Sequence, residues 1–544
     1  MHGKIRQIVT CVLLLMALAP AAAQATAVPD NPTVRIGLYF GDGALPSANL
    51  ENSTGSGYRF GYFDADRDFH QLGTTDDTQI TMLKNKNMYL SGGAYSETPS
   101  PSAVAVGCYH IQLPGSYATY AGARTAANAR SGAFPVWISG AYSVRVGAYT
   151  SKEAAQAAQA ALNLSGSTIA GPGDDVVTVA NTRTGEVLFQ FDGGSSAALA
   201  IQPGLDDAVK TTTWFKGYRY YGAFQYRRLD GGNLTVVNFV LLEDYIKGIL
   251  PYEMGSSWPL EALKAQAVCA RTYTVMNLGK HDTYGFDLCN TTDCQVYHGV
   301  NGANSNSDRA VEETKGVYVW YHGELAQTFY FSCDGGGTES CGNVWNEDIP
   351  YLKGVSDPYE ASVSSKISQY HWTVTYTASE LKSILQKNSC ACADIVNFYV
   401  SQRTDTGNVY SIAFEDSNGK TYTFSKQQVR NLLGLRSARY EIGGGNSGYY
   451  VDGMGTKLDT VSGLYAINGS GNTAVIGEAP YVVTGTGESQ ILTPGASGKD
   501  TYTVSGSGWG HLIGMSQWGA YAMASQGKTY DQILTFYFTG ITIQ

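Results

Sequence analysis

The chain has 544 residues, enough for roughly three or four domains, and 43% of them are hydrophobic, as in a globular protein. Its 46 acidic residues outnumber its 36 basic ones, and no cluster of Lys or Arg offsets the net charge of −10, which argues against nucleic-acid binding. Glycine (64 residues) and tyrosine (38) are abundant while only 15% of residues are charged, a composition that favours an extracellular protein rich in strands.

The first 27 residues follow the pattern of a secretory signal. His2, Lys4 and Arg6 precede the apolar run IVTCVLLLMALAP, and small residues follow in AAAQATA. A retained single-pass anchor is the alternative, because the run is short for a membrane span but not impossibly short. We therefore expect residues 1–27 to be a signal peptide and the protein to be exported, with a membrane involved only if this segment is kept.

Residues 28–100 are expected to form a β-rich N-terminal segment. Strand-like runs occur in TVRIGLYF, YRFGYFDA and QITMLKNKNMYL, and a stretch rich in Gly, Ser and Asn separates the first two. Nothing in this segment indicates a function.

Residues 104–165 are expected to form a β-α-β-α module with a repeated half. AVGCYHIQL favours a strand and YATYAGARTAANAR a helix; AYSVRVGAYTSKEAAQAAQAAL then favours a strand and a helix that begins after Thr150 or Ser151, with Glu153 in its first turn. YSVRVGAYTSKEAAQAAQAAL resembles the sporulation-related repeat (SPOR) domain, which implies binding to peptidoglycan glycan strands stripped of stem peptides. A packing module without a ligand is the alternative.

The rest of the chain, residues 175–544, is expected to form one domain. Short strands alternate with turns in residues 175–245, a helix is predicted over residues 259–277, and residues 316–332 suggest a hairpin turned at His322–Gly323.

Residues 440–500 are rich in Gly, Ser and Thr and are predicted to be an insertion in this domain. Strands and helices do not alternate regularly through residues 175–544, so the predicted fold class is α+β, with a small α/β module before it.

Glu253 stands out because this acid is surrounded by apolar and aromatic residues. Pro259 suits the first position of a helix, which would place Glu253 on the turn that enters it. A helix N-terminus lowers the pKa of a nearby carboxylate, but burial beside Tyr252, Met254 and Trp258 would raise it by more. Burial therefore predicts that Glu253 is a general acid near neutral pH.

The segment around Glu253, LLEDYIKGILPYEMGSSWPLEALKAQAVCARTY, closely resembles the signature of the stage II sporulation protein D family, which includes amidase enhancers. Further blocks follow in order: CNTTDCQVYHG, TFYFSCDGGGTES, YLKGVSDPYE and GWGHLIGMSQWGAYAMASQGKTYDQILTFYFTG. The resemblance spans residues 213–360 and 502–540.

The resemblance implies a peptidoglycan lytic transglycosylase, active in cell-wall remodelling during sporulation, with Glu253 as its catalytic residue. Glu253 would protonate the glycosidic oxygen and then accept the proton of the C6 hydroxyl of N-acetylmuramic acid, which attacks its own anomeric carbon and leaves a 1,6-anhydro end. One carboxylate suffices because this nucleophile is tethered. By residue type, Trp258, Tyr297 or Trp518 would stack on sugar rings. The family's other substrate-groove positions fall on Arg271, Ser332, Gly336, Thr338, Glu339, His511, Ser516 and Gln517.

Some family members bind structural zinc through two cysteines and two histidines, and this region of the chain has part of that set. Cys289 and Cys294 are present with His281 upstream, but Asp293 occupies the position of the second histidine. We expect zinc here, with Asp293 or His298 completing a tetrahedral site. A disulfide between the two cysteines is the alternative in an exported protein. Catalysis itself would need no cofactor.

A second hypothesis is a glycan-binding enhancer of a separate cell-wall amidase that cleaves no glycan itself. Glu253 favours the enzyme, because a binding surface needs no proton donor. A zinc hydrolase is not supported, since the sequence lacks H-E-x-x-H. Under either hypothesis the expected partners are peptidoglycan glycan strands and, for the enhancer, an amidase.

Overall fold

The computed structural model describes residues 28–52, 54–368, 370–444 and 501–544, together with short strands between residues 449 and 491. The predicted signal segment, residues 1–27, and most of the predicted insertion at residues 440–500 lie outside the described residues. Helices and strands are mixed without regular alternation, in several sheets, which confirms the predicted α+β class. None of the helices in these ranges combines the length and apolarity that a membrane crossing needs.

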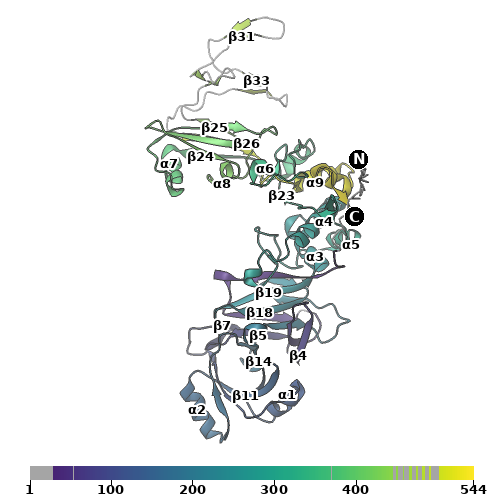
Figure 1. Ribbon diagram of the computed structural model, residues 1–544, viewed down its shortest axis with the longest axis vertical. Coiled ribbons are helices and arrows are strands. Elements are labelled where there is room, and N and C mark those ends of the chain that lie inside the picture. Colours follow the sequence, from purple (N-terminus) through teal and green to yellow (C-terminus); the bar gives the residue numbers. More distant parts are fainter. Residues whose placement is uncertain are drawn as a thin grey trace, which may run out of the picture.

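Two large sheets form the lower body of the molecule (Figure 1). The seven-stranded sheet has the order β20-β1-β19-β18-β15-β3-β4. Its strands in chain order are β1 Thr33–Tyr39, β3 Tyr58–Phe63, β4 Phe69–Thr75, β15 Leu199–Pro203, β18 Ala223–Arg228, β19 Leu234–Leu241 and β20 Leu288–Cys289.

The ten-stranded sheet has the order β12-β9-β11-β10-β14-β13-β5-β2-β16-β17. Its strands in chain order are β2 Ser47–Asn52, β5 Gln79–Lys84, β9 Tyr109–Gln112, β10 Ala133–Ile138, β11 Ala141–Tyr149, β12 Thr168–Ala170, β13 Val177–Asn181, β14 Val187–Asp192, β16 Thr213–Phe215 and β17 Tyr218–Tyr220. A small sheet, β7-β6-β8, joins Ala94–Ser96, Met88–Ser91 and Val104–Val106.

The N-terminal strands do not form a sheet of their own. β1 pairs with β19, β3 with β15, and β5 with β13, all antiparallel. The predicted boundary near residue 100 therefore cuts across sheets that are continuous in the structure, because each of these strands pairs with a strand more than ninety residues away.

The predicted elements of residues 104–165 are present. Helix α1 (Tyr120–Asn128) packs on β10 and β11, and helix α2 (Lys152–Ala161) packs on β9 and β11. Ser151 caps α2 by accepting a hydrogen bond from the Ala154 N–H, as its sequence predicts. The structure adds the β10–β11 hairpin and the closing strand β12.

A helical layer follows the sheets in the middle of the molecule (Figure 1). Helix α4 is buried along most of its length and packs against four other helices, so it is the centre of this layer. The helices are α3 Leu242–Glu253, α4 Leu260–Met276, α5 Ser305–Glu313, α9 Gln517–Ser525 and α10 Tyr530–Tyr537. The predicted hairpin is confirmed, with β21 (Val319–Tyr321) and β22 (Glu324–Leu325) turned at His322–Gly323.

A further unit with its own hydrophobic core lies within the stretch predicted to be a single domain. Its core includes Trp372, Leu381, Phe414 and Tyr502 and is separate from the main core. The unit contains β24 His371–Thr377, α7 Ala378–Lys387, β25 Ile395–Arg403, β26 Val409–Asp416, β27 Thr421–Ser425, α8 Gln428–Asn431, β28 Tyr440–Gly444 and β35 Thr501–Ser507. We call it the upper unit, from its place in Figure 1.

Short elements complete the described chain. Between the helical layer and the upper unit lie β23 Tyr330–Phe331, α6 Cys341–Val344, the 3-10 helix Glu360–Lys366 and β36 Met515–Ser516, and β37 Thr542–Ile543 joins β21. Three strand pairs lie beyond the upper unit: Tyr449–Tyr450 with Lys457–Leu458, Tyr465–Ile467 with Thr473–Val475, and Tyr481–Val483 with Ser489–Ile491.

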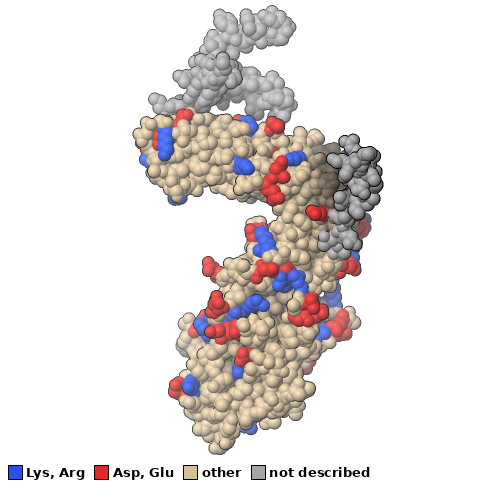
Figure 2. Space-filling view, viewed as in Figure 1, with Lys and Arg blue, Asp and Glu red and all other residues tan. Residues whose placement is uncertain are grey.

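The outline is strongly bent, and the upper unit extends over a hollow beside the helical layer (Figure 2). On the face shown, Lys and Arg are interspersed with Asp and Glu, and most of the surface carries neither.

Candidate functional site

A pocket of about 510 Å³ lies where the helical layer meets the upper unit, and Glu253 lines it. Three of the eight other positions predicted for the substrate groove line it as well: Ser332, His511 and Gln517. The remaining wall residues are Tyr273, Thr292, Asp293, Cys294, Val296, Phe329, Tyr330, Phe331, Trp345, Arg430, Trp509 and Gly510.

The Glu253 carboxylate is held by hydrogen bonds to both of its oxygens. Oε1 accepts from the Val296 N–H at 2.9 Å, and Oε2 accepts from the Gln517 side chain at 3.3 Å. Burial raises the pKa of Glu253 above its ordinary value, and these bonds, with one from Tyr330, oppose the increase without cancelling it. The predicted raised pKa is therefore confirmed.

The predicted position of Glu253 on the turn entering the next helix was wrong. Glu253 is the last residue of α3, and α4 begins only at Leu260. The carbonyl groups at a helix C-terminus disfavour a negative charge, so the helix end does not oppose burial here.

The pocket walls also differ from those predicted. Tyr252 precedes Glu253 in α3, where successive residues are about 100° apart, and Met254 is the extended residue that ends the helix, so neither lines the pocket with Glu253. The Tyr252 ring packs edge-on against His298, and Met254 is buried in the main core. Trp258 contacts Trp518, with ring centroids 4.5 Å apart, outside the lining of the pocket.

Tyr297 has no role at the pocket surface. It is 1% exposed and its hydroxyl donates to the Asn238 side chain at 2.8 Å. The structure therefore does not support the predicted stacking of Tyr297 on a sugar ring.

His511 is an uncharged residue in the pocket wall. Burial and the neighbouring Arg430 charge lower the pKa of His511 to about 4. Its Nδ1 accepts a hydrogen bond from the Ile513 N–H at 3.0 Å, and its ring packs on Phe331 and Trp345. A neutral, packed imidazole of this kind shapes the pocket wall and contributes no charge to it.

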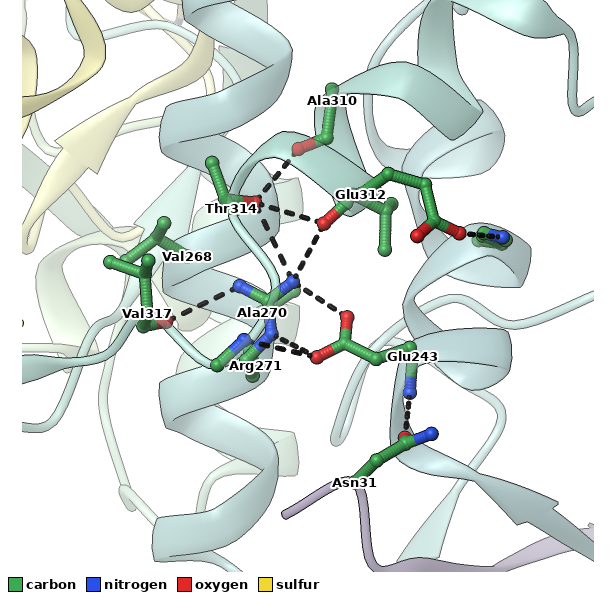
Figure 3. A network of polar contacts seen from close by, with 12 residues as sticks. Asn31, Glu243, Val268, Ala270, Arg271, Ala310, Glu312, Thr314 and Val317 are labelled. Carbon is green, nitrogen blue, oxygen red and sulfur yellow. Dashed lines mark hydrogen bonds and ion pairs between the residues drawn. The ribbon is translucent and has the colours of Figure 1, made fainter.

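Arg271 lies in the protein core and not in the pocket. Its side chain has no exposed surface and forms two hydrogen bonds to Glu243, at 2.9 and 2.7 Å. The guanidinium also donates to the Val317 carbonyl (Figure 3) and to the Val311 carbonyl. The structure thus gives Arg271 a supporting role, tying α4 to α3, in place of the predicted contact with substrate.

The other four predicted groove positions are likewise internal supports. The Glu339 carboxylate accepts hydrogen bonds from the side chains of Asn343, Thr404, Thr406 and Asn408. The Thr338 hydroxyl accepts from the Val355 N–H, the Gly336 N–H donates to the Asp334 carboxylate, and the Ser516 hydroxyl donates to Glu360. None of these four lines the pocket that contains Glu253.

Comparison with known proteins finds a family match over part of the chain. Residues 230–321, which include Glu253, match the family model described as SpoIID, stage II sporulation protein. The chain is 32% identical over 314 residues to the amidase enhancer of Bacillus subtilis (strain 168), covering 55% of this chain and 40% of that protein. It is 28% identical over 326 residues to stage II sporulation protein D of the same organism, covering 57% and 76%. Residues 230–321 therefore match the stage II sporulation protein family, and a longer part of the chain is similar to stage II sporulation protein D and to an amidase enhancer.

A third relative, an uncharacterized protein of Brachyspira hyodysenteriae, is 29% identical over 328 residues, which cover 73% of that protein. The chain spans less than half the length of the amidase enhancer that it matches. The SPOR-like resemblance of residues 104–165 stays a prediction.

Within the family-matched segment, four potential metal ligands converge beside the pocket. Donor atoms of His281, Cys289, Asp293 and Cys294 all lie within 4.8 Å of one another. His281 Nε2 is 3.3 Å from Cys294 Sγ and 3.2 Å from the Asp293 carboxylate. Two thiols, an imidazole and a carboxylate are a donor set that zinc accepts in tetrahedral geometry.

The structure selects between the two residues predicted to complete this set. His298 lies elsewhere, with its ring stacked on Tyr218 at 4.8 Å, so Asp293 is the fourth group. Cys289 and Cys294 are free thiols in the described chain, and the hydrogen bond between them lowers the pKa of Cys289.

Sequence reasoning missed Arg430, Trp345 and Trp509 in the pocket wall. Arg430 comes from α8 of the upper unit, a segment outside the blocks that resemble the family. Trp345 and Trp509 are separated by more than 160 residues and meet only in the fold. Both tryptophans fall within the range that resembles the family, Trp509 in the block that begins GWGHLIG, but neither was assigned a role from the sequence.

Proposed function

We propose that this protein is a peptidoglycan lytic transglycosylase that cleaves peptide-stripped glycan between N-acetylmuramic acid and N-acetylglucosamine. The observation that carries the proposal is Glu253, a half-buried carboxyl group with a raised pKa at the wall of a pocket lined by aromatic rings. Aromatic faces suit the apolar faces of sugar rings, and a protonated carboxyl group supplies the acid that a glycosidic oxygen needs on leaving.

The reaction needs one acid–base group. Protonated Glu253 donates its proton to the glycosidic oxygen as the bond to the anomeric carbon breaks. The C6 hydroxyl of the same muramic residue attacks that carbon, and the Glu253 carboxylate accepts the hydroxyl proton. The product is a 1,6-anhydro ring, and Glu253 returns to its protonated state. The Val296 N–H and the Gln517 amide hold the carboxylate in place through both steps.

The pocket offers no free second carboxylate for hydrolysis. Asp293 is the other acid among its described lining residues, and it is engaged by Lys280 at 3.1 Å and His281 at 3.2 Å. A hydrolysing glycosidase uses a second carboxylate as nucleophile or base. A tethered hydroxyl replaces it, with a large effective concentration.

The test is the identity of the ends released from peptide-stripped glycan by the wild-type protein. Mass spectrometry should find 1,6-anhydro-muramic ends. Release should be fastest where Glu253 is protonated and should fall as pH rises through its raised pKa, because the carboxylate cannot donate the first proton. Reducing ends would indicate hydrolysis and contradict the proposal.

A second candidate is favoured by the 32% identity to an amidase enhancer. In that case the pocket would bind glycan without cleaving it, and the protein would stimulate a separate cell-wall amidase. Glycan binding by the wild type with no fragments released, and amidase stimulation unaffected by Glu253→Gln, would support the enhancer over the enzyme.

Export and glycan targeting complete the proposal. Residues 1–27 would direct the chain out of the cytoplasm, and the SPOR-like module at residues 104–165 would bind stripped glycan strands. The family match supports a role in cell-wall remodelling during sporulation.

We further propose that His281, Cys289, Asp293 and Cys294 hold a structural zinc ion. Zinc would fix the loop that carries Val296, whose N–H holds Glu253. The purified protein should contain about one zinc ion per chain by elemental analysis, and Cys294→Ser should lose most of it. Cys341→Ser, at a buried cysteine outside this set, is the matched control. A metal-free protein in which Cys289 and Cys294 resist thiol reagents until reduced would establish the disulfide instead.

A further inference from the structure

The pocket that contains Glu253 has a single cationic side chain among its described lining residues. That residue is Arg430, on α8 of the upper unit. His511, next to it, is neutral because burial and the Arg430 charge lower its pKa to about 4. The positive charge of the pocket therefore comes from Arg430.

The protein supplies hydrogen-bond acceptors for only part of the Arg430 guanidinium. Its Nε donates to the Leu435 carbonyl at 3.2 Å, and within the described chain no carboxylate forms an ion pair with its guanidinium. The three nearby carboxylates already have other partners. Glu253 accepts hydrogen bonds from Val296 and Gln517, and Asp293 pairs with Lys280 and His281. Glu339 accepts hydrogen bonds from hydroxyl and amide groups.

A half-buried guanidinium without a counter-charge is costly unless something else supplies one. Burial lowers the pKa of Arg430, yet an arginine keeps its charge at any physiological pH. Its terminal N–H groups form a planar fork that matches a carboxylate in two parallel hydrogen bonds. An anionic group on the ligand of this pocket would complete the pair.

We propose that Arg430 is a specificity-determining residue that binds a free carboxylate of the glycan substrate. This inference rests on the proposed function. In N-acetylmuramic acid the lactyl carboxyl group is charged when free and is a neutral amide when a stem peptide is attached. Arg430 would thus distinguish stripped glycan from peptide-bearing glycan by charge, a few bonds from the reacting sugar ring.

The experiment compares two preparations of the same stripped glycan, one with free lactyl carboxylates and one with those groups converted to primary amides. Wild type should show a ratio of kcat/KM, free acid over amide, of about tenfold or more, the range for a charged hydrogen-bonded pair. Arg430→Gln should reduce this ratio to near one, and Arg430→Lys, which keeps the charge without the fork, should give an intermediate value. Arg403→Gln is the matched control, because Arg403 lies on β25 of the same unit, pairs with Glu441 and does not line the pocket; its ratio should stay that of the wild type.

Equal loss of kcat/KM on both preparations with Arg430→Gln would overturn the proposal and give Arg430 a structural role. If the wild type releases no anhydro ends, the proposed function fails, and binding decides the present inference. Glu253→Gln and Glu253→Gln/Arg430→Gln would then be compared for binding to the two preparations. Loss of discrimination in the double variant supports a carboxylate site, and unchanged discrimination overturns it.

Discussion

Glu253→Gln should reduce the release of anhydro-muramic ends by about 10²- to 10⁴-fold, the contribution of a general acid–base group. The amide keeps the shape of the side chain and an oxygen for the Val296 N–H, but it has no proton to give to the glycosidic oxygen. Mass spectrometry of the fragments from stripped glycan, with wild type and variant at equal concentration, measures the effect.

Glu261→Gln is the matched control for this variant. Glu261 lies in the first turn of α4, pairs with Lys264 at 2.8 Å and does not line the pocket. We expect activity close to that of the wild type. The thermal midpoint of Glu253→Gln should not fall, because burial already disfavours the charged form of the native residue. An active Glu253→Gln variant would show that another group provides the acid.

Elements with local signals were predictable from the sequence. Helix α2 begins after a Ser cap with Glu153 in its first turn, and the β21–β22 hairpin turns at His322–Gly323, where both residues have positive φ. In each case the residues that determine the structure are neighbours in the chain.

Helix α3 was missed because its signals conflict. Its first residue, Leu242, directly follows the strand-like apolar run of β19, and Pro251 stands in its last turn. A proline inside a helix usually marks its end or a kink. The sequence therefore indicated a turn before Glu253, whereas the structure continues the helix through it.

The candidate site was predictable only in part. The resemblance identified Glu253, but it did not separate residues that face the pocket, such as Gln517, from those that support it, such as Arg271. Arg430 could not be found at all, because only the packing of the upper unit against the helical layer brings it to the pocket.

Arg271→Met should lower the free energy of unfolding by about 3–5 kcal/mol, because it leaves the Glu243 carboxylate buried without its partner. The Arg271 side chain is 0% exposed and that of Glu243 only 9%, so water cannot replace the lost bonds without opening the α3–α4 contact. Urea unfolding, followed by a probe in the helical layer, measures the change.

The double variant Arg271→Met/Glu243→Leu shows whether Arg271 only stabilises the fold or also contacts the substrate. Removing both charges leaves no buried ion alone, so most of the lost stability should return, as for other buried pairs replaced by apolar residues. If Arg271 acts only through packing, this variant should also bind stripped glycan as the wild type does. A restored fold with weakened glycan binding would mean that Arg271 reaches substrate in a conformation that differs from the one in Figure 3. A loss below about 1 kcal/mol for Arg271→Met alone would mean that the pair is screened like a surface salt bridge.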